Sequence, residues 1–541
     1  MAHSSVDQEG AVPRARHAGE PGAESEAEGG RSGHGRGGGR RRRPEPGSPK
    51  PKRRILRWSA LTLAVVILGT AGAAYLYYEH LNANIQKDKL NLGDSDVPKA
   101  TPNAAGQTPL NVLLIGSDSR NSAKDLALGG ARKEVGRAGL ADVQMLVHVS
   151  ADRTNMSVVS LPRDTEIPIP RCTDPHSGHT YPALSLAMAN ESLARGGPGC
   201  TVATWQKLTN IHIDHFMMVD FSGVVDMADA IGGVPVCVKQ NVWSHTHDGH
   251  GSGLKLKKGT TYVKGEQALQ WLRTRYGFED GTDLGRTHAQ HMYMNAMVRQ
   301  LREKATLDNP GAMRDLAETA TKALEVDEGL GTIKKLYDLS EEFKRVPTER
   351  ITMTTLPTVQ WSQDHDRLVP APEDADQLLS MVRDDSPLDG RGVKKKAEEK
   401  AKTPADPDGR IAVQVRNGTG ADGQAPAQQR ALAVVQVLQG KGFARATADA
   451  TPASQARTTV LYPSADLEGD AQAVAQALGV PLKQVRKSTD VSGVTLLVGA
   501  DWRTGTGYKA PAQPTKAPTS AAVLPGDQKG ACMEVQKGFT W

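Results

Sequence analysis

The hydrophobic pattern of the chain begins with one long apolar run, and the alternating and amphipathic segments all follow it. The run from Trp58 to Tyr78 contains 21 residues without a charge, which is enough for a helix to cross a hydrocarbon layer of about 30 Å. Aromatic residues stand at both of its ends, where rings with a polar edge settle among lipid headgroups. This length and the terminal tyrosines favour a retained transmembrane helix over a cleaved signal peptide, whose apolar core is shorter.

The charges that precede this run predict its orientation. Between Arg40 and Arg57 there are nine lysines and arginines and one glutamate. Because positive charge is retained on the cytoplasmic side of a membrane, we expect a single-pass signal-anchor in the cell membrane with its N-terminus in the cytoplasm. The segments after Tyr78 are then expected to be extracellular.

Beyond the run, short apolar stretches alternate with helical patterns, as in layered α/β folds. Turn residues at 151–155 separate two of the stretches, which predicts a hairpin. We therefore predict a layered α/β/α domain with a mixed sheet over residues 109–383. Its expected strands are 110–116, 144–150, 156–162, 215–221 and 234–238, and its expected helices are 181–194, 202–208, 222–231 and further segments from about 286 to 343.

The rest of the chain divides by composition. Residues 384–409 form a charged linker punctuated by prolines, and residues 410–502 return to strand and helix patterns, which predicts a second, small α/β domain of a size that folds independently. We expect residues 79–108 to form a polar stalk. Residues 1–57 and 503–541 are expected to be disordered, since they hold too few apolar side chains to build a core.

Net charge limits the partners of the chain. Residues 1–57 carry +6 and the whole chain carries +5, so the remainder is close to neutral. A charge argument for nucleic-acid binding therefore fails for the outer part, and residues 1–57 show no helix-turn-helix pattern. The basic cluster instead predicts contact with anionic lipids of the inner leaflet, at roughly 1 kcal/mol per charge. No specific nucleic-acid partner is expected.

The four cysteines all lie after the predicted span, on the oxidising side of the membrane. Disulfides persist in that compartment, and the absence of a CxxC pair in the sequence disfavours zinc. Cys172 and Cys200 flank a loop with proline and glycine, and closing it could add on the order of 3 kcal/mol. Cys237 and Cys532 form a weaker second candidate pair, because the segment around Cys532 is expected to be disordered.

Polar residues cluster at the ends of the predicted strands and form an arginine and aspartate set. Arg273 and Arg275 leave the same face if their segment is extended, and Arg286 and Gln290 share a helix face. Converging guanidinium forks match a polyanion such as a pyrophosphate, and carboxylates beside them suit a hard divalent cation. The set comprises Asp118, Asp142, Arg163, Arg273, Arg275, Arg286 and Gln290.

Six ordered blocks within Leu110 to about Gln300 resemble the LytR-CpsA-Psr family of membrane-anchored cell-wall enzymes. They are NVLLIGSDSR, ADVQMLVHVS, VVSLPRDTEIPIP, IHIDHFMMVDFSGVVDMADAIGGVPVCV, LKLKKGTTYVKGEQALQWLRTRY and DLGRTHAQHMYMNAM. The later blocks AVQVRNGTG, TTVLYP and VTLLVG resemble the LytR C-terminal accessory domain of actinobacterial members.

The resemblance implies a phosphotransferase that ligates a glycopolymer from a polyprenyl-pyrophosphate carrier to peptidoglycan during cell wall biogenesis. It implies Mg²⁺ or Mn²⁺ at Asp118 and Asp142. Catalytic roles fall on Asp142, Arg163 and Arg275, and pyrophosphate binding falls on Arg163, Arg273, Arg275, Arg286 and Gln290. Many members have Arg-Ser-Asp where this chain has Leu140-Ala141-Asp142, so one expected arginine is missing. Arg132 or Arg137 is its candidate replacement.

More than one function stays open on these residues. The same set would serve a hydrolase of the lipid pyrophosphate, with water replacing the sugar hydroxyl. A cell-envelope transcriptional attenuator, the role in the family's older naming, also stays open, as does an inert wall-binding scaffold. His245, His247 and His250 lie in a glycine-rich loop and are expected to be solvated. The strand 215–221 and three methionines could line a groove for the prenyl chain, although core packing is the default; these methionines are Met292, Met294 and Met297.

Overall fold

A computed structural model describes residues 51–541 with short gaps. The gaps are 93–94, 96, 101, 104–105, 120–138, 305–309, 392–403, 421–423, 456, 489, 511–513 and 527–530. Residues 1–50, which hold most of the basic segment that we expected to be disordered, lie outside the described part. So do Arg132 and Arg137.

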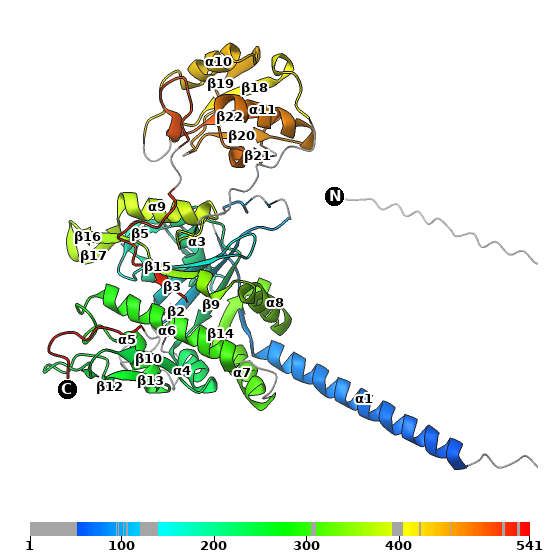
Figure 1. Cartoon of the computed structure of the whole chain (residues 1–541), viewed down its shortest axis with the longest axis vertical. Coiled ribbons are helices and arrows are strands. Elements are labelled where there is room, and N and C mark those ends of the chain that lie inside the picture. The colour runs from blue at the N-terminus through cyan, green and yellow to red at the C-terminus, as the bar shows by residue number, and fades with distance from the viewer. Residues whose placement is uncertain are drawn as a thin grey trace, which may run out of the picture. The chain divides into compact units, whose positions relative to one another are not determined.

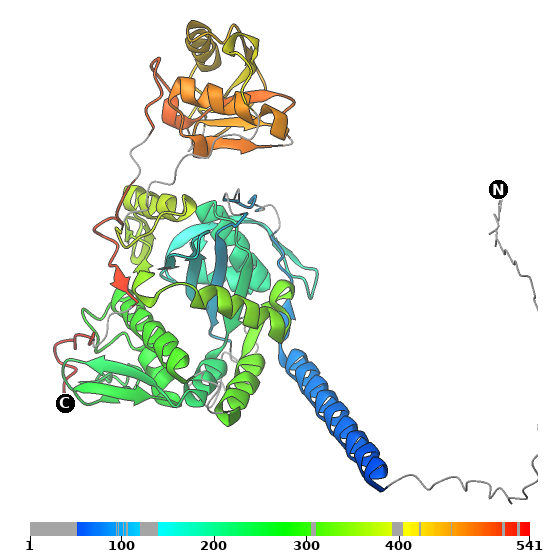
Figure 2. The same ribbon diagram turned by 45° about the vertical axis from the view of Figure 1, so that its right-hand side comes forward.

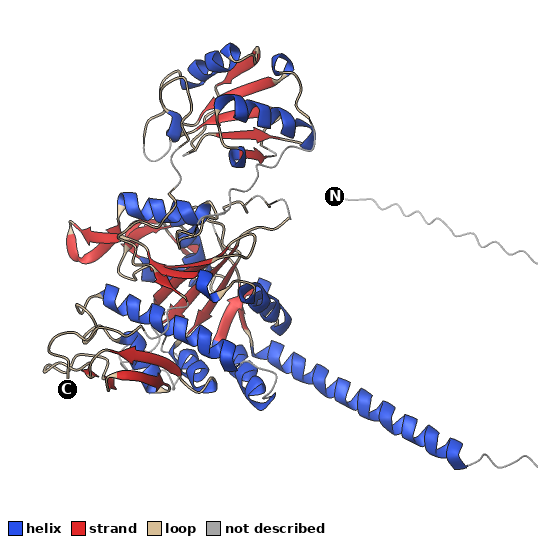
Figure 3. Ribbon diagram, in the orientation of Figure 1, coloured by secondary structure: helices blue, strands red, loops and turns tan. Residues whose placement is uncertain are grey.

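The predicted apolar run forms most of one long helix, α1 (Pro51–Asn84), which Figure 3 shows in blue. Within it, residues 54–84 are long and apolar enough to cross a membrane. Its two threonine hydroxyl groups are satisfied inside the helix, since Thr62 Oγ1 donates to the carbonyl of Trp58 and Thr70 Oγ1 to that of Val66, both within 3.0 Å. Such internal pairing is what a hydrocarbon environment requires of a polar group.

The end of α1 and the strand that follows it are part of the folded domain, contrary to the expected stalk over 79–108. Leu81 and Ile85 are buried, and β1 (Gln86–Asp88) pairs in parallel with β14 (Leu324–Asp327) at the edge of the main sheet. The two apolar residues are one helical turn apart, so they bury together. The polar composition of this segment therefore gave no sign of the edge strand β1.

The predicted strands assemble into a mixed eight-stranded sheet in the order β1-β14-β9-β2-β3-β4-β15-β23. β2 pairs antiparallel with β3 and parallel with β9, and β4 pairs parallel with β15. The expected hairpin is β3 followed by β4. The bounds are β2 (Leu110–Ser117), β3 (Ala141–Val149), β4 (Met156–Ser160), β9 (His215–Val219), β15 (Ile351–Thr355) and β23 (Leu524–Pro525).

Helices cover both faces of this sheet, which confirms the layered α/β/α prediction (Figure 1). Alternate residues of β2 point to opposite faces: Leu113 joins a core with α3 and α9, and Val112 joins a core with α8. The helices are α3 (Gly197–Thr209), α6 (Asp283–Lys304), α7 (Pro310–Ala323), α8 (Ile333–Lys344) and α9 (Pro372–Arg383). The hairpin of β16 (Thr358–Trp361) and β17 (Asp364–Pro370) precedes α9.

The helix expected over residues 181–194 is wrong. That stretch holds β8 (Leu184–Met188) and the 3-10 segment η2 (Ala189–Arg195), and β8 pairs with β5 (Glu166–Ile169). The apolar residues of LSLAM alternate, which is a strand period. The short strands β6 (Cys172–Thr173) and β7 (Thr180–Tyr181) lie beside it.

A lobe beside the sheet supplies the second wall of the site. The helices α4 (Phe221–Ala230), α5 (Glu266–Arg273) and α6 pack with the hairpin of β10 (Val234–Val238) and β13 (Gly259–Val263). Trp271, Phe278 and Tyr293 are fully buried in its core. The views of Figures 1 and 2 both show α6 running along this lobe. A smaller hairpin joins β11 (Val242–Trp243) to β12 (Lys255–Leu256).

A second α/β domain follows, as predicted. Its five-stranded sheet has the order β19-β18-β22-β20-β21, and it has a separate core that includes Val413, Val434 and Leu496. The bounds are β18 (Ala412–Asn417), α10 (Arg430–Gly440), β19 (Arg445–Asp449), β20 (Thr459–Tyr462), α11 (Glu468–Leu478), β21 (Val485–Lys487) and β22 (Val494–Val498).

Described residues near the C-terminus pack onto the rest of the protein, which corrects the expectation of a disordered tail over 503–541. β23 pairs with β15, Cys532 is bonded to Cys237 with 4.4 Å between their Cα atoms, and Met533 is fully buried. Figure 2 shows this red segment beside the green lobe. The segment needs no core of its own because it adds to the sheet and the lobe. The predicted disulfide between Cys172 and Cys200 is also present, with a Cα–Cα distance of 5.6 Å.

We expect the stability of the folded protein to depend on pH through Glu325 of β14. Burial, followed by the charge of Asp88, raises the pKa of Glu325 to about 7 from 4.5, against a smaller opposing effect of His176. The folded state therefore favours the protonated carboxyl group of Glu325. The stability that this group contributes is full below pH 4.5 and is lost as the pH rises through about 7. We expect Glu325→Gln to melt several degrees above wild type at pH 8 and close to it at pH 4.5.

Thermal melts of the two proteins at these two pH values measure the effect. Glu349→Gln, at an exposed position, is the matched control and should leave the melting temperature unchanged at both. Equal melting of Glu325→Gln and wild type at pH 8 would contradict the prediction.

Candidate active site

A cavity of about 420 Å³ lies between the ends of the sheet strands and the lobe. Every residue of the predicted arginine and aspartate set lines it: Asp118, Asp142, Arg163, Arg273, Arg275, Arg286 and Gln290. The structure thus brings together side chains from five separate stretches of the chain. Their convergence was predicted, and their individual roles remain predictions.

A β-bulge places Asp142 in the cavity. Gly116 of β2 is opposite Val143 of β3, but the next residue, Ser117, is opposite Ala141. Asp142 is therefore the extra residue on β3, and a bulge of this kind re-aims a side chain beside a site. A Cβ on Gly116 would lie 2.9 Å from Cβ of Val143, so this close approach of the two strands needs glycine.

Asp118 closes the end of the same strand pair. Its backbone N–H donates to the carbonyl of Leu140 at 3.0 Å, and its Oδ1 accepts from the N–H of Leu140 at 2.5 Å. The side chain is 7% exposed. One carboxylate oxygen of Asp118 is thus committed to holding the start of β3, whereas the carboxylate of Asp142 pairs with an arginine side chain.

Arg163 follows β4 and pairs with the bulge residue. Its Nη1 donates to Oδ1 and Oδ2 of Asp142 at 3.0 and 3.2 Å, and its Nε lies 3.4 Å from Oδ1 of Asp164. The side chains of Arg163 and Asp142 are 25% and 22% exposed. This pairing fixes a cation and a carboxylate side by side at the cavity wall, both still accessible to a ligand.

Arg273 and Arg275 reach the cavity from the end of α5. Arg273 is the last residue of that helix, and Thr274 is extended with ψ 116°, so the pair spans a helix end and not the strand that we considered. The guanidinium carbon of Arg273 lies 5.1 Å from the ring centroid of Phe221, a cation–π distance. Both arginines still line the same cavity.

The first turns of α6 supply the remaining contacts. Arg286 and Gln290 share a face of this helix, as predicted, and are 7% and 6% exposed. Gln290 Nε2 donates to the carbonyl of Leu272 at 3.2 Å, which ties α6 to the end of α5. The N-terminus of a helix is itself favourable for an anion.

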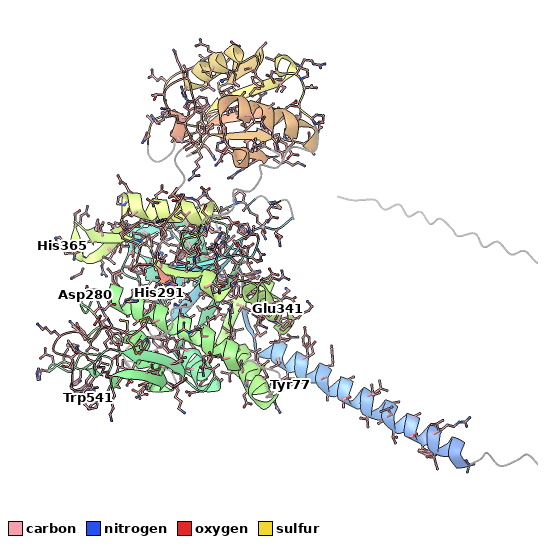
Figure 4. The ribbon with its side chains drawn as sticks, in the orientation of Figure 1. Tyr77, Asp280, His291, Glu341, His365 and Trp541 are labelled. Atoms are coloured by element: carbon pink, nitrogen blue, oxygen red, sulfur yellow. A yellow bond between two sulfur atoms is a disulfide. The ribbon has the colours of Figure 1, made fainter. Side chains whose placement is uncertain are left out.

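His291 anchors α6 against the sheet from below the site. Its Nε2 lies 2.9 Å from Oγ of Ser160 at the end of β4, and Figure 4 labels it in the interior of the domain. Burial lowers the pKa of His291 to about 3. The ring is therefore neutral at physiological pH and holds the helix that carries Arg286 to the strand that precedes Arg163.

The sequence pattern did not single out Asp220, which also lines the cavity. Its Oδ1 caps α4 by accepting from the N–H of Gly223 at 2.8 Å, and an aspartate just before a helical pattern is the available signal. Apolar residues complete the wall: Val143, Val219, Phe221, Val224, Leu269 and Leu272. Met292, Met294 and Met297 pack against the cores instead.

The side chains that line the cavity fit a divalent cation only when a bound substrate supplies further oxygen atoms to it. Among the residues that the structure describes, no group of three or more histidine, cysteine, aspartate or glutamate side chains could hold a metal by itself. Asp118 and Asp142 offer two carboxylates in one cavity, and magnesium is commonly held by one or two carboxylates together with substrate phosphates.

In the histidine-rich loop, the ring of His245 stacks on the ring of Trp243, with 4.9 Å between their centroids.

Fold and cavity together define an α/β protein with an arginine-rich anion pocket at the ends of its sheet strands. The chain belongs to the LytR_cpsA_psr family, whose model matches residues 74–383. A second model, described as LytR cell envelope-related transcriptional attenuator, matches residues 410–502.

Characterised relatives cover about half of the chain. The cell wall biosynthesis protein LcpA of Corynebacterium glutamicum is 28% identical over 314 residues, which are 54% of this chain and 58% of that protein. The chain thus spans less than two thirds of this relative's length. A protein of Bacillus cereus, named polyisoprenyl-teichoic acid–peptidoglycan teichoic acid transferase TagU, is 25% identical over 54% of this chain and 84% of its own.

Among solved structures, a LytR-Csp2A-Psr enzyme from Actinomyces oris is similar at 20% identity with a TM-score of 0.40. The likeness covers 55% of this chain and 96% of that one.

Proposed function

We propose that this protein is a membrane-anchored phosphotransferase that ligates a polyprenyl-pyrophosphate-linked glycopolymer to peptidoglycan. The observation that carries the proposal is the convergence of four arginines and three carboxylates in one cavity with an apolar wall. Family membership and relatives named for cell wall biosynthesis and teichoic acid transfer to peptidoglycan support it.

The proposed reaction breaks a phosphoanhydride bond and forms a phosphoester bond. A hydroxyl oxygen of the peptidoglycan glycan attacks the phosphorus that bears the glycopolymer, and the bond from this phosphorus to the bridging pyrophosphate oxygen breaks. The products are a phosphodiester between glycopolymer and peptidoglycan and a polyprenyl monophosphate, which keeps the electron pair of the broken bond. The proton of the hydroxyl passes to a carboxylate, and thus to solvent.

The arginines act on the charge of this reaction. Phosphoryl transfer requires in-line positioning and neutralisation of the phosphate oxygens more than covalent catalysis. Arg163, Arg273, Arg275 and Arg286 reach the cavity from β4, α5 and α6, so their forks surround a diphosphate from several sides. The six apolar residues of the wall suit the first units of the prenyl chain.

Asp118 and Asp142 are the residues that would hold Mg²⁺ or Mn²⁺ together with the pyrophosphate. Such an ion would supply further charge neutralisation when bound. Of the two carboxylates, Asp142 is the better candidate for accepting the hydroxyl proton, because its side chain is 22% exposed whereas Asp118 is only 7% exposed.

The proposed topology follows from the charges around α1. Nine lysines and arginines lie between Arg40 and Arg57, just before the apolar run, so we place residues before Trp58 in the cytoplasm and both folded domains outside the cell. This arrangement gives the cavity access to peptidoglycan and separates residues 410–502 from DNA, which disfavours a transcriptional attenuator.

One reconstitution tests the function. The protein is incubated in detergent with Mg²⁺, a polyprenyl-pyrophosphate-linked glycan and uncrosslinked peptidoglycan glycan strands. The expected product is glycan covalently linked to peptidoglycan, with release of polyprenyl phosphate, and chelation with EDTA should suppress it. Glycan phosphate without any linked product would show the hydrolase instead.

Asp142→Asn gives the corresponding prediction for the carboxylates. If Asp142 accepts the proton, the variant should lower the rate constant of transfer by about 10²–10⁴-fold while the donor still binds. Asp118→Asn is the matched comparison at the same cavity: its amide oxygen can still accept from the N–H of Leu140, so it should keep its thermal stability and lose activity mainly through weaker binding of Mg²⁺. Full activity of Asp142→Asn would remove the proposed role.

A further inference from the structure

A second cavity, of about 360 Å³, adjoins the candidate active site. The two cavities share three lining residues, Leu269, Arg273 and Arg275. The rest of the second cavity is lined by Gly251, Ser252, Glu266, Gln270 and Tyr276. The arginines proposed to bind the pyrophosphate thus form the border between both spaces.

Away from these two arginines, the second cavity is lined by hydroxyl, amide and carboxylate groups that can form hydrogen bonds. Glu266 and Gln270 are one turn apart on α5, and Gln270 Nε2 donates to Glu266 Oε1 at 3.0 Å. The hydroxyl of Ser252 lies 2.6 Å from that of Thr274. The described residues that line this part include one carboxylate and no lysine or arginine, so it does not favour a polyanion.

Tyr276 adds an aromatic wall to the same cavity. The residue is 43% exposed, and its ring stacks on Phe539 with 6.3 Å between centroids and 23° between planes. Phe539 is held in turn, because its carbonyl accepts from the N–H of Trp243 at 2.8 Å. The C-terminal segment therefore supports Tyr276 in its place.

An exposed aromatic face beside hydroxyl, amide and carboxylate groups matches a pyranose. Such a sugar ring has one apolar C–H face and a rim of hydroxyl groups, so it can stack and form hydrogen bonds at once. This combination of stacking and hydrogen bonding would suit a sugar ring of the donor glycopolymer or of the peptidoglycan acceptor.

The geometry points to the acceptor: we propose that this second cavity binds a sugar ring of the peptidoglycan glycan, with Tyr276 as its stacking platform. This inference rests on the proposed function. Both substrates must meet at one phosphorus, and the donor pyrophosphate takes the first cavity. A hydroxyl presented from the second cavity reaches that phosphorus across Arg273 and Arg275, which border both.

The test measures transfer to soluble oligosaccharides of alternating N-acetylglucosamine and N-acetylmuramic acid, with the full chain in detergent. Tyr276→Ala should raise the acceptor KM roughly 3–10-fold, as expected for loss of one aromatic stacking contact, and leave the donor KM unchanged. Tyr276→Phe keeps the ring and should stay close to wild type. Tyr262→Ala removes another tyrosine of the lobe, 57% exposed and outside both cavities, and should have no effect.

Two results would overturn the inference. One is an acceptor KM of Tyr276→Ala equal to that of wild type, and the other is a rise in the donor KM alone, which would assign the ring to a donor sugar. Calorimetric titration of the same oligosaccharide into wild type and Tyr276→Ala shows whether the proposed sugar site fails or the proposed transferase function fails. If wild type forms no linked product yet binds the oligosaccharide more tightly than the variant, the sugar site stands and the transferase proposal falls.

Discussion

Replacing Arg275 by alanine is expected to lower the rate constant of polymer transfer by about 10²–10³-fold, the usual cost of losing one preorganised donor to a developing charge. Arg275 lines both cavities, so its guanidinium is placed where donor and acceptor meet. Its carbonyl accepts from the N–H of Phe278, a backbone contact that the substitution leaves in place. An interaction made mainly in the transition state should reduce kcat and kcat/KM alike.

Arg275 gives a clearer test than Arg163. Removing Arg163 would also leave Asp142 without its partner at 3.0 Å, so a loss of activity would not separate charge neutralisation from displacement of the carboxylate. Arg275→Lys keeps the charge but loses the planar fork, and it should recover only part of the rate.

The matched control for Arg275 is Arg345→Ala, at the residue that follows α8. The side chain of Arg345 is 58% exposed and pairs with Glu342, so its loss should leave transfer within about twofold of wild type, as weak surface ion pairs predict. Activity of Arg275→Ala within threefold of wild type would contradict a role for this arginine in the reaction.

Much of the central fold could be predicted from the sequence because its buried strands are nearly continuous apolar runs. Such runs leave little ambiguity when turn residues bound them, as around β2, β3 and β4. The stretch 181–194 was misread because the alternation of Leu184, Leu186 and Met188 extends over only five residues, too short a run to separate a strand from a helix by period.

The candidate site could be predicted as a set of residues but not as a geometry. Arginines and aspartates just after strands are visible in the sequence, and the resemblance to a known family selects them. The bulge that turns Asp142 toward the cavity is not visible, since it depends on the register of β2 against β3. The border formed by Arg273 and Arg275 between two cavities likewise depends on where α5 ends.

The C-terminal segment escaped prediction because its order comes from partners far away in the sequence. Cys532 is bonded to a cysteine 295 residues earlier, and Trp541, labelled in Figure 4, donates from Nε1 to the carbonyl of Val242 at 3.1 Å. Lys255 lies 4.3 Å from the Trp541 ring centroid. Apart from the candidate cysteine pair, the local composition gives no sign of these contacts.

This segment supports the loop that carries Arg275. The side-chain oxygen of Gln536 accepts from the N–H of Gly277 at 2.9 Å, and the backbone N–H of Gln536 donates to the carbonyl of Gly277 at 3.0 Å. The backbone N–H of Glu279 donates to the carbonyl of Glu534 at 3.1 Å. The disulfide between Cys237 and Cys532 fastens the segment to β10. The position of Arg275 is thus linked to a covalent bond formed outside its own loop.

Cys532→Ser, combined with Cys237→Ser to avoid a free thiol, is therefore expected to lower both stability and activity. Loss of a native disulfide typically costs about 2–5 kcal/mol, which thermal unfolding measures. Transfer by the remaining folded protein should fall by about tenfold or more, since small displacements of catalytic groups have large effects on rate.

The other disulfide provides the control for this prediction. Cys172 and Cys200 close a loop near α3 and lie outside both cavities, so their double serine variant should lose stability while its folded fraction keeps the wild-type rate. If both pairs of substitutions lower kcat equally at a temperature where each protein is folded, the C-terminal segment has no specific effect on Arg275. If neither lowers it, the loop holds its arginine without that support.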